Sequence, residues 1–359
     1  MNTLWITLIV VVVLAWLAKS QDLQFEGGIT TQRIHHSNKT KFFFILIVLV
    51  LIFVAGCRYY VGSDFRAYYH DYVTYINELP EALRTFNEPV IRLIYKIVTL
   101  IWRDGWACIL SVAAITLILE LRFVYINTDD ILLASILFMF IMFSSCFNAV
   151  RQSLAVAVFC CGFPFLRERR FKPYLLVCII AFLCHRSALV LLPIYFVVHR
   201  KLRLLNLLLV LAGVILLFQS YELLFSAVGL VSGEDVNLND SYWTNSVNVL
   251  STITAVVPFF AFILILNDHE KTEEETFYLN LLLIHAVISV VTMNSTAIAR
   301  TRMYSAPFLV IAIPELLKKT NIKYRRVIAY VIVILYGIVW WYTSKDIVWS
   351  WMWQRGHAV

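Results

Sequence analysis

Apolar runs separated by short polar connections fill almost the whole chain. Twelve of these runs are long enough, or nearly long enough, to cross a lipid bilayer as a helix. They cover residues 3–18, 41–57, 105–121, 131–147, 150–166, 173–185, 187–198, 204–220, 246–266, 277–293, 305–317 and 326–342. The pattern predicts an all-α fold, a polytopic membrane helix bundle of about 12 transmembrane helices.

The polar connections predict the orientation of the bundle. Three of them are short and strongly basic: residues 167–172 (RERRFK), 199–203 (HRKLR) and 318–326 (KKTNIKYRR). Lysine and arginine are enriched in cytoplasmic loops, so these three connections are expected in the cytoplasm. Both termini then lie outside, and the largest outer loops span residues 58–104 and 221–245.

Residues 88–102 resemble a span but do not fit this orientation, because a crossing here would put RERRFK outside. Arg92 and Lys96 are four residues apart on one predicted helical face, and apolar residues cover much of the rest. We expect an amphipathic helix on the outer (periplasmic) membrane face, with a re-entrant segment as the alternative. Residues 173–185 and 187–198 are also short and predict a tilted pair or one helix broken at His185.

Composition narrows the class of protein. The chain is 61% hydrophobic and 15% charged, with a mean hydropathy of +0.78, which excludes an ordinary soluble domain. We expect one integral-membrane domain over residues 1–359. Phosphate loops, dinucleotide turns, nucleophile elbows and acidic clusters with metal spacing are missing from the sequence, so we expect no metal, no cofactor and no nucleic-acid partner.

Ionisable and amide side chains from five separated segments converge at the predicted outer ends of the spans. These residues are Asp64 and Arg66; Glu88 and Arg92; Asn148, Arg151 and Gln152; His185 and Arg186; and Arg300 and Arg302 with Tyr304. An arginine near a span end often extends toward the head groups, and we expect this of Arg58. A convergence of five segments at one level instead indicates a site on the outer face.

Arg151 is the most informative of these residues. If a helix begins near Asn148, then Asn148, Arg151 and Gln152 share a small, polar face by helical spacing. A charge on such a face points into the bundle or a water-filled cavity, where it needs a partner. The guanidinium therefore pairs with Asp64 or Glu88, or it binds an anionic group of a ligand.

The order of these motifs resembles one known family. They are Gly62-x-Asp64, Glu88-Pro89, Asn148-x-x-Arg151-Gln152-x-x-Ala155, the stretch FLCHRSAL with His185, and Ala299-Arg300-x-Arg302-x-Tyr304. Over residues 41–310 the chain resembles the EpsG-type, or Wzy-like, polymerases of bacterial exopolysaccharide, O-antigen and capsule repeat units. Arg186 stands where a neutral residue is expected.

The resemblance implies a glycosyltransferase in the bacterial cytoplasmic (inner) membrane, with its site facing outside. Such enzymes move a glycan chain from undecaprenyl diphosphate to a hydroxyl of the next undecaprenyl-diphosphate-linked oligosaccharide. It also implies contact with membrane lipid and work alongside a flippase and a chain-length regulator of the same pathway.

This chemistry needs a base and a set of cations. The candidate bases are His185, Asp64 and Glu88, and the alternative role for one of the carboxylates is to orient an arginine. For the diphosphate we expect Arg151, Arg300 and Arg302, supported by Gln152, Tyr304 and Asn148. Arg66, Arg92 and Arg186 are further candidates.

Two other functions fit parts of the pattern. A transporter or flippase for a lipid-linked or anionic solute suits many spans, but it would carry polar groups near the midplane. A membrane acyltransferase could use His185, but it would need that residue to be reached from the cytoplasm.

Overall fold

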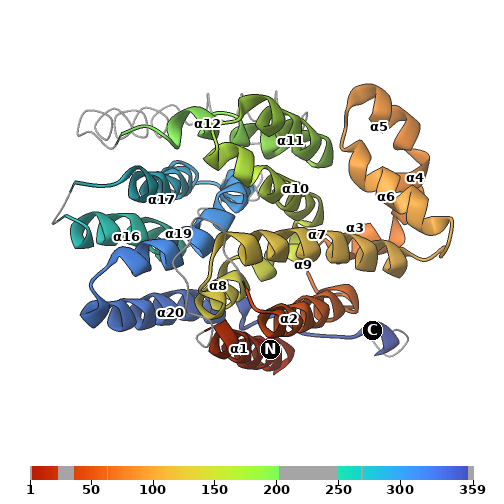
Figure 1. Ribbon diagram of the computed structural model, residues 1–359. Helices are drawn as coiled ribbons and strands as arrows, with labels where there is room; N and C mark the ends of the chain where they lie inside the picture. The colour runs from red at the N-terminus through yellow and green to blue at the C-terminus, as the bar shows by residue number, and fades with distance from the viewer. Residues whose placement is uncertain (1, 23–35, 63, 202–248, 268–269, 355–359) are drawn as a thin grey trace.

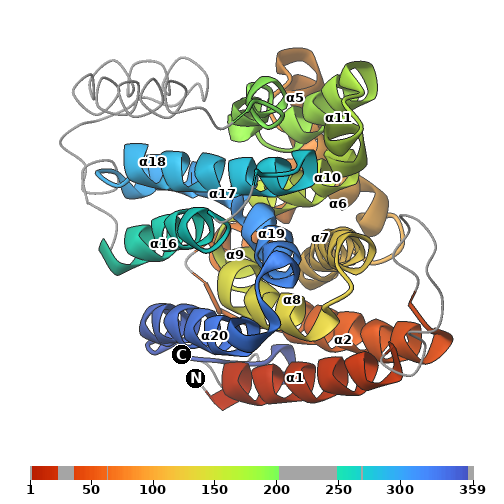
Figure 2. The same ribbon diagram turned by 60° about the vertical axis from the view of Figure 1, so that its left-hand side comes forward.

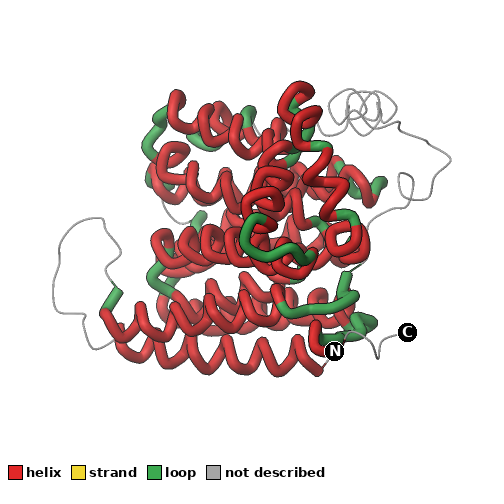
Figure 3. Tube along the Cα trace, turned by 90° about the vertical axis from the view of Figure 1, so that its right-hand side faces the viewer, coloured by secondary structure: helices red, strands yellow, loops and turns green. Residues whose placement is uncertain are grey.

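The described chain is built from helices and loops. The computed structural model describes residues 2–22, 36–62, 64–201, 249–267 and 270–354. Within these ranges there is no strand, and one isolated backbone bridge joins Arg58 to Trp351 (Figure 3). The predicted all-α fold is confirmed for this part of the chain.

Six helical segments of the described chain are long and apolar enough to cross a membrane. They are α2 (Asn38–Gly56), α7 (Gly105–Asn127), α8 (Ile131–Phe138) continued by η1 (Met139–Phe143) and α9 (Ser145–Asn148), α10 (Val150–Arg167), α17 (Glu273–Val291) and α20 (Ile322–Ser344). The protein is therefore a multi-pass membrane protein.

Further helices of the described chain lie at other predicted spans. They are α1 (Asn2–Asp22), α11 (Phe171–Cys184), η2 (Arg186–Leu191) with α12 (Ile194–Val197), α16 (Val249–Ile265) and α19 (Ala306–Lys319). The predicted span 204–220 and the predicted loop 221–245 lie outside the described residues. The count of twelve transmembrane helices therefore stays a prediction.

The long helices pack in rows with their axes roughly aligned (Figures 1 and 2). α1 lies along α2, α7 contacts both α2 and α10, and α17 lies between α16 and α19. Four short helices gather at one end of the bundle, at the right of Figure 1. They are α3 (Phe65–His70), α4 (Tyr72–Asn77), α5 (Leu79–Thr85) and α6 (Pro89–Thr99). We call this end of the bundle the α6 end.

Helix α6 is amphipathic, as predicted for residues 88–102. Its 11 residues span roughly 16 Å, too short to cross a bilayer. Ile91 and Tyr95 are buried, whereas Leu93 and Ile97 are exposed. Arg92 and Lys96 are four residues apart on α6, as predicted, but Arg92 turns inward to hydrogen-bond the chain before the helix, whereas Lys96 is exposed.

The segment from α11 to α12 is a hairpin that turns at His185. The backbone of His185 is extended, and η2 folds back along α11. Tyr174 of α11 donates a hydrogen bond to the Leu191 carbonyl at 2.5 Å, which fixes the two arms together. Of the two predicted arrangements, the structure therefore shows the pair.

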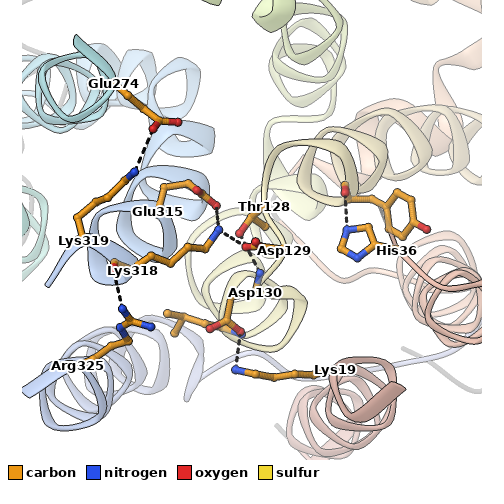
Figure 4. Close-up of polar contacts among 12 residues, drawn as sticks. Lys19, His36, Thr128, Asp129, Asp130, Glu274, Glu315, Lys318, Lys319 and Arg325 are labelled. Atoms are coloured by element: carbon orange, nitrogen blue, oxygen red, sulfur yellow. Dashed lines mark hydrogen bonds and ion pairs between the residues drawn. The ribbon is translucent and has the colours of Figure 1, made fainter. Parts of the chain in front are cut away.

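Charged residues also gather at the end of the bundle opposite α6. Lys319 pairs with Glu274 at 3.1 Å, Lys19 pairs with Asp130 at 3.0 Å, and Lys318 lies between Glu315 and an aspartate (Figure 4). Arg167, in the basic connection RERRFK, also pairs with Glu274. Two of the three basic connections that predicted the orientation, residues 167–172 and 318–326, thus meet at one end of the bundle.

Candidate functional site

Glu88 is the centre of a cluster of ionisable side chains at the α6 end. Its buried carboxylate contacts two partners from distant parts of the sequence, an arginine and a histidine. Oε2 accepts a hydrogen bond from Arg151 Nη1 at 2.5 Å, and Oε1 is hydrogen-bonded to His185 Nδ1. Arg151 Nε also donates to the Tyr68 hydroxyl at 3.2 Å. Three segments, before α6, in α10 and after α11, therefore meet at one carboxylate, and α3 is joined to them through Arg151.

The backbone at Glu88 adopts a left-handed conformation, with φ 53° and ψ 52°. A residue with a Cβ disfavours this region, so other contacts must hold it. Arg92 supplies them: Nη1 donates to the Asn87 and Glu88 carbonyls at 2.6 and 3.1 Å, and Nη2 donates to Glu78 Oε2 at 3.1 Å. Pro89 then begins α6 at a position that suits proline. Arg92 thus fixes the turn that aims Glu88, and its role in binding substrate stays a prediction.

The surroundings of Glu88 favour its ionised form. Burial disfavours the charge, but the hydrogen bond with His185 and the charge of Arg151 outweigh burial and lower the pKa of Glu88. An ionised carboxylate can only accept hydrogen bonds, so His185 Nδ1 carries a proton. In the neutral ring, Nε2 then has a free lone pair, and the His185 side chain is 25% exposed. The arrangement is that of a base held by a carboxylate.

A break in the helix places Arg151. Helix α9 ends at Asn148, Ala149 leaves the helical region with ψ 57°, and α10 begins at Val150. The expectation that Asn148 and Arg151 share one helical face is therefore wrong, because a turn separates them, and Asn148 is exposed. Arg151 keeps Nη2 free of hydrogen bonds to the described residues, so one edge of the guanidinium remains open to a ligand.

Tyr68 and Gly62 complete the surroundings of Arg151. Burial raises the pKa of Tyr68 to about 12, so this hydroxyl is neutral when it accepts the bond from Arg151. Gly62 has φ +96°, and a Cβ there would lie 2.4 Å from the Phe147 carbonyl oxygen. Only glycine lets residues 61–62 pack so closely against the end of α9.

A short helix, η3 (Arg300–Tyr304), is bonded to this cluster at both ends. It follows α18 (Thr296–Ala299) and precedes α19. Gln152 Nε2 donates to the Arg300 carbonyl at 2.8 Å, and the Tyr304 hydroxyl is 3.0 Å from Ser187 Oγ. Gln152 follows Arg151, and Ser187 is two residues after His185. The structure therefore assigns Gln152 and Tyr304 contacts that position η3.

Beside η3 lies a cavity of about 500 Å³. We call it the η3 cavity, and its lining residues come from eight elements and from the joint at Ser144 between η1 and α9. They are Phe140, Ile141, Ser144, Ser145, Ser251, Thr254, Ala255, His285, Ala299, Arg300, Arg302, Met303, Ala306, Leu309, Tyr336, Val339 and Thr343. None of these described residues is acidic, and burial lowers the pKa of Arg302. An anionic group would therefore neutralise buried positive charge here.

The remaining predicted residues lie around the cluster. Asp64 lies immediately before α3, one turn before Tyr68, and its charge acts on that hydroxyl. Arg66 is exposed on α3. Arg186 Nη2 lies 3.5 Å from the Thr85 carbonyl, on the far side of the turn from Glu88. Their predicted roles in catalysis or binding stay predictions.

The expectation that Arg58 extends toward the head groups is wrong. Its side chain is buried and donates to the Ala55 and Cys146 carbonyls. Its guanidinium also lies over the rings of Phe65 and Phe147, at 5.8 and 5.5 Å. These carbonyls and rings replace water around the charge, and only the folded arrangement brings them together.

Two residues near the site were missed from the sequence. His285 lines the η3 cavity and hydrogen-bonds Ser305 Oγ at 2.9 Å through Nδ1. Glu120 of α7 is buried, and its Oε2 has no partner among the described residues. Each is an ionisable residue inside a predicted span, and that placement alone could have identified them.

Within the described residues no group of three or more His, Cys, Asp or Glu could hold a metal ion.

Comparisons with known proteins identify a family. No curated protein and no solved structure matches the chain. The model of the EpsG family matches residues 41–351, which is most of the chain and contains the whole cluster around Glu88. The protein belongs to the EpsG family.

Proposed function

We propose that the protein is a polysaccharide polymerase of the bacterial cytoplasmic membrane. It transfers a glycan chain from undecaprenyl diphosphate to a hydroxyl of an undecaprenyl-diphosphate-linked repeat unit, at the outer face. Family membership supports a role in polysaccharide synthesis. The observation that carries the reaction is the pairing of His185 with Glu88 beside a cavity lined by arginines.

In this proposal His185 is the general base. Glu88 accepts the Nδ1 proton and leaves Nε2 to take the proton of the acceptor hydroxyl. The hydroxyl oxygen then bonds to the anomeric carbon, while the bond from that carbon to the diphosphate oxygen breaks. The proton stays on the imidazole until the product leaves, and Arg151 helps to keep Glu88 ionised during the step.

The leaving diphosphate takes up the electron pair of the broken bond. Cations preorganised in a site that excludes water stabilise such charge strongly. Arg300 and Arg302 line the η3 cavity, and in this proposal the open edge of Arg151, which belongs to the cluster on the other side of η3 and does not line the cavity, is the third contact. We assign the diphosphate to these three residues.

The placement of the charges favours an enzyme over a transporter. Glu88, His185 and Arg151 lie at helix ends on one side of the bundle, next to the short helices α3–α6. A transporter needs polar groups along its path from one side to the other. The outer level predicted for His185 likewise opposes an acyltransferase that takes its donor from the cytoplasm.

The test is the length distribution of the surface polysaccharide in a strain that lacks the gene. The strain is complemented with the intact protein, Arg151→Lys, Arg151→Ala or His185→Ala, and protein levels are measured in each. We expect single repeat units in the null strain and a ladder with the intact protein. His185→Ala should slow polymerisation by about 10²–10⁴-fold, the usual contribution of a general base.

A matched control is Lys96→Ala, because Lys96 is exposed on α6 close to the cluster. This variant should restore the full ladder. If the null strain instead accumulates lipid-linked units on the cytoplasmic side, the protein moves the lipid across the membrane and the polymerase proposal is wrong.

A further inference from the structure

Three buried polar side chains between α2, α7 and α10 have atoms without a hydrogen-bond partner among the described residues. They are Glu120 of α7, Ser153 of α10 and Arg58 after α2, each no more than 2% exposed, and the atoms are Oε2, Oγ and Nε. Buried polar atoms are almost always bonded to protein or to ordered water. Three such atoms in one region therefore indicate partners other than the described side chains.

Two small cavities of about 10 Å³ each lie at these atoms. The polar lining of the first, which we call the Glu120 cavity, comes from Glu120, Ser145 and Ser153. The second, which we call the Arg58 cavity, is lined by Arg58, Thr116 and again Ser153, so the Ser153 hydroxyl connects the two. Such a volume holds about one water molecule, and each cavity offers the two or more polar partners that a buried water needs.

The Glu120 cavity adjoins the η3 cavity. Ser145, Met303 and Ala306 line both of them, so a single layer of side chains separates Glu120 from the larger cavity. Ser145 is the polar member of this layer, and its hydroxyl can accept and donate hydrogen bonds. A proton can therefore pass between Glu120 and the η3 cavity without crossing the whole bundle.

The surroundings of Glu120 favour a carboxyl group that carries a proton. The titratable groups that face it from neighbouring elements are the thiols of Cys146 in α9 and Cys160 in α10, and neither is a cation. Arg58 and Arg302 line the adjoining cavities and do not line the Glu120 cavity. An isolated charge in an apolar interior is far less stable than the neutral form of the same group. A protonated carboxyl group is also a hydrogen-bond donor, which an ionised one is not.

We propose that Glu120 is a proton-binding site inside the bundle, joined to Ser153 and Arg58 by one water in each small cavity, and that its proton exchanges with the η3 cavity. The Glu120 carboxyl group donates to the first water, which donates to Ser153 Oγ. The Ser153 hydroxyl and Arg58 Nε both donate to the second water. All three atoms then have partners. The proton also keeps Glu120 neutral, so this carboxyl group does not offset the positive charge of Arg302 in the η3 cavity.

The waters are tested by X-ray hydroxyl-radical labelling of the full-length purified protein in nanodiscs. Irradiation turns a bound water into a radical that oxidises a neighbouring methionine to its sulfoxide before it diffuses away. Met142 lines the Glu120 cavity and is 3% exposed, whereas Met139, three residues earlier and 0% exposed, lines none of the three cavities. Both are shielded from bulk water, so we expect Met142 to be oxidised several-fold faster than Met139.

Two serine variants test the link between the cavities. Ser153→Val removes the shared hydroxyl and adds volume, so the oxidation of Met142 should fall to the rate of Met139. Ser289→Val is the matched control, because Ser289 on α17 is also buried with an unpartnered hydroxyl but lines neither small cavity, and it should leave Met142 unchanged. A low rate at Met139 shows that each variant is folded. If the valine at position 153 prevents folding, the comparison of the two methionines in the intact protein still decides the point.

The proton is tested by infrared difference spectra of the intact protein against Glu120→Gln at neutral pH. An amide closely replaces a protonated carboxyl group, so this variant should fold like the intact protein. We expect the C=O band of a protonated carboxyl group in the intact protein only, and this band should shift in deuterium oxide while the protein stays folded. Ser153→Ala should move the band to higher frequency, because the first water loses a partner and bonds Glu120 less strongly.

Equal oxidation of Met142 and Met139 would show that the Glu120 cavity is dry and would overturn the proposal. Equal effects of the two valine variants would also overturn it. A difference spectrum without a band of a protonated carboxyl group would show that Glu120 is ionised, and a band that does not shift in deuterium oxide would show that its proton does not exchange. Either result contradicts the proposal. These measurements need no glycan and no lipid-linked substrate, so they succeed or fail independently of polymerase activity.

Discussion

Glu88 combines a buried charge, an arginine and a histidine as neighbours, and a left-handed backbone at a single residue. The charge is stable only while His185 and Arg151 stay in place, and the backbone is stable only while Arg92 holds its carbonyls. Removing one partner of such a buried pair leaves the other without compensation, which costs more than the pair itself contributes. Each neighbour of Glu88 therefore stabilises either its charge or its backbone.

The first prediction concerns pH. The pKa of Glu88 is lower in the folded protein than its ordinary value of 4.5, so its ionised form stabilises the fold above that pH. This stabilisation is lost as the pH falls through the lower folded value. Thermal unfolding in detergent, followed from about pH 7 down to about pH 3, should show a steeper acid loss for the intact protein than for Glu88→Gln. Parallel curves would contradict the assignment of the charge to Glu88.

The second prediction compares two glycines. Gly62→Ala adds a Cβ 2.4 Å from the Phe147 carbonyl oxygen at φ +96°, and the backbone conformation alone costs about 1–2 kcal/mol. The variant should lower the unfolding temperature and displace the turn before Arg151. Gly337→Ala, where the nearest atom is 3.5 Å away, should instead stabilise α20 by about 0.5–1 kcal/mol. Thermal unfolding checks the stability of both variants, and the polysaccharide ladder checks their function.

Sequence could predict the members of the cluster but not their pairing. Arg151 and His185 lie at the ends of predicted spans, and Glu88 begins the helix predicted on the outer face. All three are on the same predicted side, so the topology indicates that they lie at one level. Which carboxylate Arg151 contacts depends on the turn at residues 86–88, whose left-handed backbone no local pattern indicates. Arg58 was misjudged because the rings of Phe65 and Phe147 that enclose it come from segments far apart in sequence.

At the scale of elements, η3 separates the cluster around Glu88 from the η3 cavity. One of its ends is held by Gln152 and the other by Ser187, and its two arginines line the cavity. An element with contacts on two sides transmits a displacement from one side to the other. Variants of the two tethers should therefore alter binding in the cavity without touching a ligand.

The third prediction concerns this tether. Gln152→Leu removes the bond to the Arg300 carbonyl and should raise the apparent KM for lipid-linked units several-fold, because the arginines lose their position. Gln152→Asn has a side chain too short to reach the Arg300 carbonyl, so it should raise the apparent KM in the same way. Gln152→Glu should also raise it, because a carboxylate accepts hydrogen bonds and cannot donate one to that carbonyl. Polymerisation by purified protein, with substrate concentration varied, separates KM from kcat. An effect on kcat alone would place Gln152 at the reacting atoms.

The chain after α20 is a second element that positions the site. Residues 345–354 return across the α6 end, where Tyr59 N donates to the Ser350 carbonyl and Met352 N donates to the Cys57 carbonyl, both at 2.9 Å. Trp349 packs against Phe147 with ring centroids 5.4 Å apart, one residue before Asn148. The segment thus covers both Arg58 and the end of α9.

The fourth prediction follows from this segment. A chain ended after Lys345 should insert in the membrane but lose the polysaccharide ladder, because Phe147 and the backbone at residues 57–59 lose their partners. A chain ended after Gln354 keeps these contacts and should restore the ladder. Equal activity of the two chains would show that the segment does not position the site.

At the scale of the whole molecule, the two ends of the bundle differ in chemistry. One end carries the cluster and the short helices α3–α6, and the other carries ion pairs such as Lys19 with Asp130 and Arg167 with Glu274. Apolar periodicity predicted most of the spans in the described chain, because the bilayer requires long apolar helices whatever their packing. It could not give the extent of α7 or the hairpin at His185, which depend on contacts between helices.

The fifth prediction tests the orientation. In a background with Cys57 and Cys161 replaced by serine, Asn148→Cys should react with a membrane-impermeant thiol reagent in intact cells, because Asn148 is exposed at the α6 end. Glu168→Cys, exposed at the opposite end, should react only after the membrane is permeabilised. The reverse pattern would place the Glu88 cluster in the cytoplasm and remove the basis for polymerisation outside.

The left-handed backbone at Glu88 has a consequence for how this sequence can vary. A glycine at position 88 would relieve the backbone but delete the carboxylate. Aspartate would keep a carboxylate on a shorter side chain, and every other side chain would keep the strain without the charge. Arg92 can donate to the Asn87 and Glu88 carbonyls only while the chain before α6 keeps its present conformation. A substitution at position 88 or at position 92 alone should therefore impair function, so functional descendants of this chain should retain both residues or replace both in a single lineage.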